Sequence, residues 1–466
     1  MDRLSPLDAM FLGEDTPNEP RQIASLVVLE PDGSPLTFDG LVQVLNERLD
    51  IVPRYRQVPY KVPAGLGTPI WRDFPRFDIS QHVRRSALPK PGGRAELHEL
   101  VGRLVARRLE LDRPLWELYY IEGLANGAEA LLFKAHQALV DGSETIDLAQ
   151  VLLEETAHVR DIPHHEWEAR PEPSGATLIA GTLDRHVRHP GEALATLEVG
   201  VGKVLRTLPL LGGTSTPART VLSAKLSRHR RFTSVSTDLD KYRKVRDHHG
   251  GTVNDVILAS IAGGIRGWML TRAESAGPKT AFRAMVPMSV VSDEGLPTSL
   301  GSKVRGHLLS LPVGESNPVV RLHQVSYALK DHRETGSAVA ANKLASLPGF
   351  ATSTFHAVGA RVAESEGNRG HQIVITNVPG PQEPVYMAGE PVAEVYPCLP
   401  LTENRTVAIG VTSYRGRVFY GITADREAVP DIDVLGQCIE DALGELVETV
   451  VSKRSRAPRG RQRPQR

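Results

Sequence analysis

A chain of 466 residues exceeds the roughly 100–200 residues of a typical single domain, so we expect two domains. Its 55 basic and 55 acidic side chains cancel, which excludes the broad positive surface of a nucleic-acid-binding protein. Cys398 and Cys438 are too few for a disulfide framework. No window approaches the ~18 uninterrupted apolar residues of a membrane-spanning helix, and the first residues lack the apolar region of a signal peptide. These features predict a cytoplasmic protein.

The first half of the chain alternates strand and helix patterns, as expected of an α/β fold. The expected strands are Gln22–Glu30, Trp116–Gly123 and Ala130–Ala135, the last two joined by a turn at Asn126-Gly127. The expected helices are Phe38–Leu49, with Asp39 as its cap, Glu96–Leu109 and Ser143–Glu155. Residues 1–156 therefore form the first predicted unit.

Composition shifts after this unit, because residues 157–220 are irregular and contain several Pro and Gly residues. We interpret them as a crossover with one helix near Pro190–Leu208. The second unit, residues 221–452, begins with a strand at Thr233–Leu239. It continues with a helix at Val253–Arg272, in which Gly263-Gly264 permits close packing. Further expected strands are Phe282–Pro287, Leu308–Leu311, Gln372–Asn377, Thr406–Tyr414 and Arg417–Ala424. A tight turn at Arg415-Gly416 is expected to join the last two strands, and a helix at Ile432–Val450 follows.

The segment His136-Gln137-Ala138-Leu139-Val140-Asp141-Gly142 follows a predicted strand directly. A strand end that opens into a loop can present a proton-transfer group, because the sheet fixes the base of the side chain. A neutral imidazole at His136 can accept a proton from an alcohol, and the Asp141 carboxylate can fix its tautomer or anchor the turn. The alternative is that His136 and Asp141 only satisfy hydrogen bonds of the loop.

Four further segments accompany this one: Leu4–Leu12 (LSPLDAMFL), Asp112–Glu117 (DRPLWE), Gly251–Val256 (GTVNDV) and Thr376–Pro381 (TNVPGP). Each has a structural interpretation, such as a turn at Asp112 or a helix cap at Asn254 with Asp255 favourable to the helix dipole. In this order and spacing, however, the five segments resemble the bacterial wax ester synthase/diacylglycerol acyltransferase family. The resemblance runs from residue 1 to about residue 450.

This resemblance implies two halves like chloramphenicol acetyltransferase, with mixed sheets, helices and a channel at their interface. It also implies transfer of a fatty acyl group from long-chain acyl-CoA to an alcohol, without a metal, other cofactor or covalent acyl-enzyme. The implied reaction centre contains His136, Gln137, Asp141, Gly142 and Asn254. The implied substrate-binding residues are Pro114, Leu115, Trp116, Asp255, Asn377, Pro379 and Gly380.

The family motif is HHxxxDG, and its second His takes the hydroxyl proton. Aligned on Asp141-Gly142, that position holds Gln137, whose amide is not basic near neutral pH. His136 can supply the base through a shifted loop, although alternation along a strand aims it away from the channel. Alternatively, the chain catalyses weakly through orientation and oxyanion stabilisation, or it binds acyl-CoA or neutral lipid without turnover.

Within the enzyme class, diacylglycerol is the expected acceptor, and a long-chain alcohol, giving a wax ester, is the alternative. Seven of the fourteen residues of the tail, 453–466, are Lys or Arg. Such a tail is expected to be disordered. The alternative is that it tethers the protein to anionic lipid, which predicts peripheral contact with the inner membrane or a lipid droplet.

Overall fold

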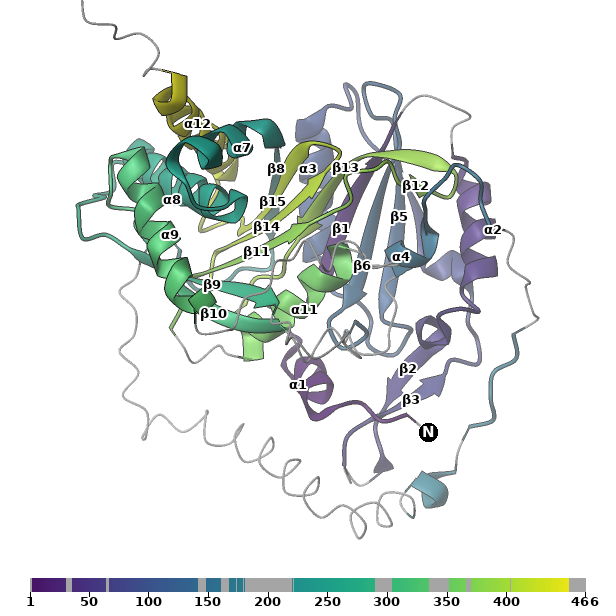
Figure 1. Cartoon of the computed structure of the whole chain (residues 1–466). Helices are drawn as coiled ribbons and strands as arrows, with labels where there is room; N and C mark the ends of the chain where they lie inside the picture. Colours follow the sequence, from purple (N-terminus) through teal and green to yellow (C-terminus); the bar gives the residue numbers. More distant parts are fainter. Residues whose placement is uncertain are drawn as a thin grey trace, which may run out of the picture.

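The first of two large sheets carries most of the N-terminal half in the computed structural model (Figure 1). The structure describes residues 2–30, 36–63, 67–140, 148–160, 167–172, 174–178, 180, 220, 222–289, 304–334, 352–365, 370–402 and 404–451. The first sheet has the order β4-β5-β6-β1-β13-β12-β7, and a separate small sheet pairs β2 with β3. These strands are β1 (Gln22–Leu29), β2 (Gln57–Tyr60), β3 (Ile70–Asp73), β4 (Val83–Ala87), β5 (Trp116–Glu122), β6 (Ala130–His136), β7 (Leu153–Glu154), β12 (Tyr386–Met387) and β13 (Glu390–Cys398).

The second sheet is mixed and has the order β10-β9-β11-β14-β15-β8. Its strands are β8 (Arg230–Asp238), β9 (Phe282–Ser289), β10 (Val304–Leu311), β11 (Ile373–Pro379), β14 (Val407–Tyr414) and β15 (Arg417–Asp425). β11 runs parallel to both of its neighbours, and the other pairs are antiparallel. The predicted turn between β14 and β15 is confirmed, because Arg415 and Gly416 both have positive φ, at 44° and 73°.

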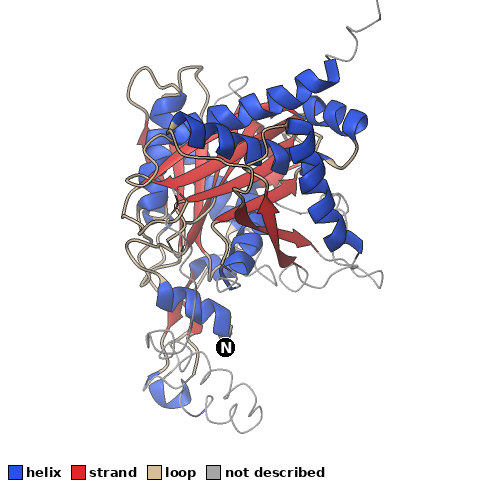
Figure 2. Ribbon diagram, turned by 90° about the vertical axis from the view of Figure 1, so that its left-hand side faces the viewer, coloured by secondary structure: helices blue, strands red, loops and turns tan. Residues whose placement is uncertain are grey.

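Four helices cover one face of the second sheet (Figures 1 and 2). They are α7 (Leu239–His249), α8 (Val253–Thr271), α9 (Pro318–Glu334) and α12 (Ile432–Val451). The predicted close packing of α8 is confirmed, because a Cβ on Gly264 would lie 2.4 Å from Cγ1 of Ile439 in α12. Among the described helices, none is long and apolar enough to cross a membrane.

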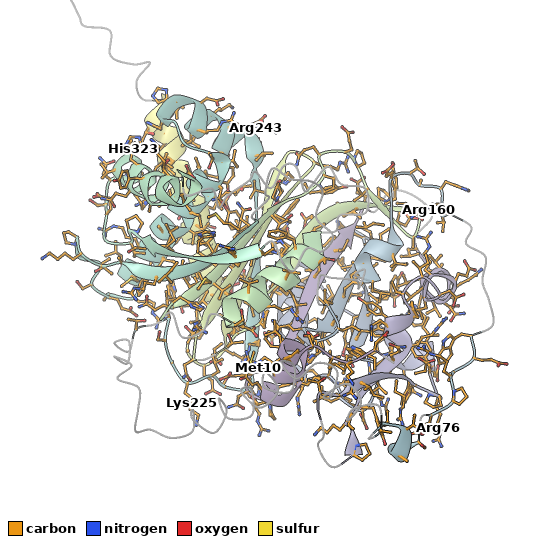
Figure 3. All side chains as sticks on the ribbon, turned by 60° about the horizontal axis from the view of Figure 1, so that its bottom comes forward. Met10, Arg76, Arg160, Lys225, Arg243 and His323 are labelled. Atoms are coloured by element: carbon orange, nitrogen blue, oxygen red, sulfur yellow. The ribbon has the colours of Figure 1, made fainter. Side chains whose placement is uncertain are left out.

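Other helices join the two halves or cover the first sheet. α3 (Arg94–Ala106) packs on both β1 and β8, and α11 (Thr352–Ser365) packs on β9, β10, β11 and β1. α11 therefore lies between the two sheets (Figure 1). The remaining helices are α1 (Pro6–Glu14), α2 (Phe38–Arg48), α4 (Leu148–Leu152) and the 3₁₀ turns η1 (Pro53–Arg56) and η3 (Ile79–Gln81). Side chains occupy the space between the ribbons, while the exposed Arg76, Arg160 and Arg243 lie at the rim (Figure 3).

A segment of the predicted second unit belongs to the first sheet. β12 and β13 pair with β7 and β1, although residues 386–398 lie within the predicted unit 221–452. The division by chain position is therefore wrong for this segment. Pro397 of β13 packs against the second sheet so closely that a Cβ on Gly421 would lie 1.9 Å from the Pro397 carbonyl oxygen. The two sheets thus contact each other through backbone as well as through helices.

Several local predictions need correction. The cap of α2 is Thr37, whose hydroxyl accepts from the Gly40 N–H, and not Asp39. The predicted helix to Glu155 ends at Leu152, because the next two residues pair with β12 as β7. Helices α9 and α11 were not predicted. The start of the predicted helix at Ser143, the helix near Pro190–Leu208 and the tail 453–466 lie outside the described residues.

Candidate active site

Gln137 lies where β6 ends and contacts the second half of the chain. Its backbone N–H donates to the Arg21 carbonyl, which continues the pairing of β6 with β1 for one more residue. The side chain is fully buried, and its Nε2 donates to Glu364 Oε1 of α11 at 3.0 Å. The Gln137 carbonyl accepts a hydrogen bond from Arg361 of the same helix. The position that the family motif assigns to the base therefore faces α11.

His136 points to the opposite side, as strand alternation predicts. The Ala138 backbone N–H donates to His136 Nδ1 at 3.0 Å, so the neutral ring carries its proton on Nε2. That Nε2 lies 4.0 Å from Asp15 Oδ2, inside the first half. Burial, followed by repulsion from Arg108, Arg361 and Arg21, lowers the pKa of His136 to about 3. In this geometry neither ring nitrogen can take a proton from a substrate, so the shifted-loop hypothesis has no support here.

Asn254 pairs with Asn377, which brings two of the predicted site residues together. Asn377 Nδ2 donates to Asn254 Oδ1 at 2.8 Å. The predicted cap at Asn254 is wrong, because α8 is capped by Thr252, whose hydroxyl accepts from the Asp255 N–H. Asp255 is fully buried and accepts hydrogen bonds from Thr252 and from Ser326 at 2.9 Å. The structure therefore gives its carboxylate a capping role, and its contact with substrate stays a prediction.

Trp116 lines a narrow pocket between the two halves. Its Nε1 donates to the Tyr55 carbonyl at 2.7 Å, and its ring stacks on His82 with the centroids 4.7 Å apart. The pocket is lined by residues of the first sheet, of η1 and of α11, among them Ser25, Tyr55, Trp116, Ala135, His356 and Pro397. Its walls are mostly apolar, which suits the chain of a lipid substrate.

The other predicted site residues occupy structural positions next to these groups. Pro114 and Leu115 are buried before β5, and the Leu115 carbonyl accepts from the His136 N–H. Pro379 ends β11, and the Gly380 N–H donates to the Ser413 carbonyl. Asp141 and Gly142 lie outside the described residues.

Sequence reasoning missed the contribution of α11. Its side chains Arg361 and Glu364 reach Gln137, and its His356 lines the pocket. The available signal was one His, one Arg and one Glu within an otherwise small and apolar stretch, Thr352–Ser365. That stretch was not recognised as a helix, so these side chains were not assigned to a common element.

Comparisons with known proteins place these observations in a family. Residues 4–257 match the wax ester synthase/diacylglycerol acyltransferase catalytic domain, and residues 300–447 match the C-terminal domain of the same family. A probable diacylglycerol O-acyltransferase of Mycobacterium tuberculosis is 31% identical over 99% of this chain and 98% of its own length. The chain belongs to the wax ester synthase/diacylglycerol acyltransferase family. The resemblance drawn from the five segments is thereby confirmed.

Solved structures agree with the fold expected of this family. The wax ester synthase/diacylglycerol acyltransferase from Marinobacter aquaeolei VT8 superposes with a TM-score of 0.67 at 23% identity, covering 96% of this chain and all of that one. The first condensation domain of the calcium-dependent antibiotic synthetase gives a TM-score of 0.54 at 14% identity, with 96% of each chain covered. The predicted α/β fold class is confirmed. Gln137, which the resemblance aligns with the second His of the family motif, contacts the Glu364 carboxylate in this chain.

Proposed function

We propose that this chain is an acyl-CoA-dependent O-acyltransferase that makes triacylglycerol from diacylglycerol and long-chain acyl-CoA. Full-length similarity to a protein named a probable diacylglycerol O-acyltransferase carries the proposal. The apolar pocket between the halves supports it, because a lipid acceptor and an acyl chain both need apolar walls close to the reacting atoms. Gln137 lies beside that interface, where an amide can orient a hydroxyl or a carbonyl oxygen by hydrogen bonding.

The activity is expected to be slower than that of a relative with His at position 137. General-base catalysis contributes typically 10²–10⁴-fold, whereas binding and orientation remain when the base is absent. Gln137→His would place an imidazole where Gln137 now donates to Glu364 at 3.0 Å. The carboxylate would then hold the ring and stabilise its protonated form.

The test is an acyl-transfer assay on the purified full chain with radiolabelled palmitoyl-CoA. Parallel reactions contain dioleoylglycerol or hexadecanol, and chromatography separates triacylglycerol from wax ester. Triacylglycerol formation by the parent above a boiled control supports the proposal, and preference for hexadecanol would favour wax ester synthesis, as the dual name of the Marinobacter protein suggests. If only Gln137→His produces ester, the native chain is a lipid-binding relative without turnover and the proposal is wrong.

We also propose that the reaction needs no metal or organic cofactor, because the acyl-CoA thioester already carries an activated acyl group. Dialysis against a chelator should leave the rate unchanged, and a loss that Mg²⁺ or Zn²⁺ restores would contradict this.

We also propose that the protein is cytoplasmic and contacts the inner membrane or a lipid droplet peripherally, because both proposed substrates have lipid character. The full chain should float with vesicles that contain anionic lipid, and a chain truncated after Val451 should float less if the basic tail contributes.

A further inference from the structure

His356 combines three features that no other described residue of the pocket shares: a titratable ring, complete burial and a free nitrogen facing the pocket. It lies in α11 with 1% of its surface exposed. Its Nδ1 lies 2.6 Å from Thr376 Oγ1 of β11. Its Nε2 is buried and has no hydrogen-bond partner. A buried polar atom without a hydrogen-bond partner destabilises the folded protein by about 1–3 kcal/mol. A substrate that hydrogen-bonds to this nitrogen would remove that penalty.

The direction of the free nitrogen follows from the bond on the other side of the ring. Thr376 belongs to the second sheet, and α11 lies between the two sheets. Because Nδ1 is turned toward Thr376, Nε2 is turned away from the second sheet. On that side the pocket is bounded by Ser25 and Ala135 of the first sheet. Ala135 lies in β6 two residues before Gln137, so strand alternation places both side chains on the same face. The free nitrogen of His356 is turned toward that face.

The other titratable groups of the pocket are already occupied. Lys134 Nζ donates to two backbone carbonyls and to Glu117 Oε2 at 2.9 Å, so all three of its protons are used. Glu117 is bound by Lys134 and by Tyr119. Among the described residues that line the pocket, His356 is the one with a buried side-chain nitrogen that has no hydrogen-bond partner.

We propose that His356 supplies the proton acceptor that the motif lacks at Gln137, an inference that rests on the proposed acyltransferase function. Nδ1–H donates to Thr376 Oγ1, and the Nε2 lone pair receives the hydrogen bond of the acceptor hydroxyl. As the hydroxyl oxygen bonds to the thioester carbonyl carbon, its proton passes to Nε2. The carbon–sulfur bond then breaks, and the CoA thiolate leaves with that proton from Nε2, so the ring returns to its neutral state.

The surroundings of His356 set the expected strength of this base. Burial lowers the pKa of His356 to about 3, so the ring is neutral and ready to accept a proton at physiological pH. A base this weak gains less from proton transfer than one whose pKa lies near the working pH. We therefore expect a contribution near the lower end of the usual range, about 10²-fold.

The test uses His356→Asn, because the Asn amide can retain the hydrogen bond to Thr376 while the Nε2 atom is removed. The matched control is His371→Asn, which removes another buried imidazole of the second half that lies outside the pocket. We expect kcat for triacylglycerol formation to fall about 100-fold in His356→Asn and less than threefold in His371→Asn. Binding of S-hexadecyl-CoA, a thioether that cannot react, should change less than twofold in both.

The same substitution in a Gln137→His background separates a catalytic role from a structural one. A second base at position 137 should make His356 dispensable, so His356→Asn should then cost less than threefold. The proposal is overturned if His356→Asn lowers kcat equally in the parent and in Gln137→His. It is also overturned if His356→Asn changes kcat less than threefold in the parent. If His356→Asn does not fold, His356→Gln is assayed in its place under the same criteria. If the parent is active and His356→Asn leaves its kcat unchanged, this inference alone is refuted. If the parent is inactive, the proposed function and this inference are refuted together.

Discussion

Replacing Arg361 with Met tests whether α11 is fastened to the first half by a buried ion pair. Arg361 Nη2 donates to Asp8 Oδ1 at 2.5 Å, with the two side chains 6% and 5% exposed. The same guanidinium donates to the Gln137 carbonyl and lies 5.0 Å from the Phe11 ring. Arg361→Met keeps most of the apolar volume but leaves the Asp8 carboxylate buried without its cation.

The expected loss follows from burial. Removing one partner of a buried ion pair typically destabilises a protein by 3–5 kcal/mol, because the remaining charge stays desolvated. Arg426 offers a matched control, because it pairs with Glu99 of α3 across the same two halves at 2.8 Å while the side chains are 43% and 45% exposed. Exposed pairs contribute about 0.2–1 kcal/mol, so Arg426→Met should cost several times less than Arg361→Met.

Urea unfolding, followed by fluorescence and circular dichroism, measures both variants against the parent. A chain of this size can unfold in more than one step. The test therefore compares the loss of stability in Arg361→Met with that in Arg426→Met under the same conditions. Asp8→Asn should recover part of the loss when combined with Arg361→Met, because it removes the unpaired charge. A loss in Arg361→Met no larger than that in Arg426→Met would refute the claim that this pair fastens α11.

Three further predictions concern packing and pH. Gly421→Ala should lower the unfolding midpoint strongly, because the new Cβ would lie 1.9 Å from the Pro397 carbonyl oxygen; an unchanged midpoint would disprove the close contact of the sheets. Gly444→Ala in α12 meets nothing within 4 Å and should stabilise the protein by about 0.5–1 kcal/mol in the same assay. Burial lowers the folded pKa of His136 and of His371 to about 3, so the unfolded chain binds more protons below pH 6.5 and stability falls as pH decreases from 6.5 toward 3. Each of these two histidines should lower the free energy of unfolding by about 2 kcal/mol at pH 5 relative to pH 7. Equal urea midpoints at pH 7 and pH 5 would contradict this.

Local patterns in the sequence determined much of the fold. Hydrophobic periodicity over a few residues predicts helices α8 and α12 and the apolar strands β1, β5 and β6. Local turn chemistry predicts the turn at Arg415-Gly416. The opposite directions of His136 and Gln137 follow from the same local rule. The sequence also indicated the family, because the resemblance rests on five short segments in a fixed order.

Tertiary structure alone decided what surrounds those residues. Gln137 meets Glu364, which is 227 positions away in the chain, and the tautomer of His136 depends on one backbone N–H at Ala138. β13 joins the first sheet although it follows most of the second sheet in sequence. Likewise, the sequence supplied His356 as one of many histidines, and only the packing of α11 between two sheets left its Nε2 free beside the pocket. Such contacts depend on how distant elements pack, which no local pattern encodes.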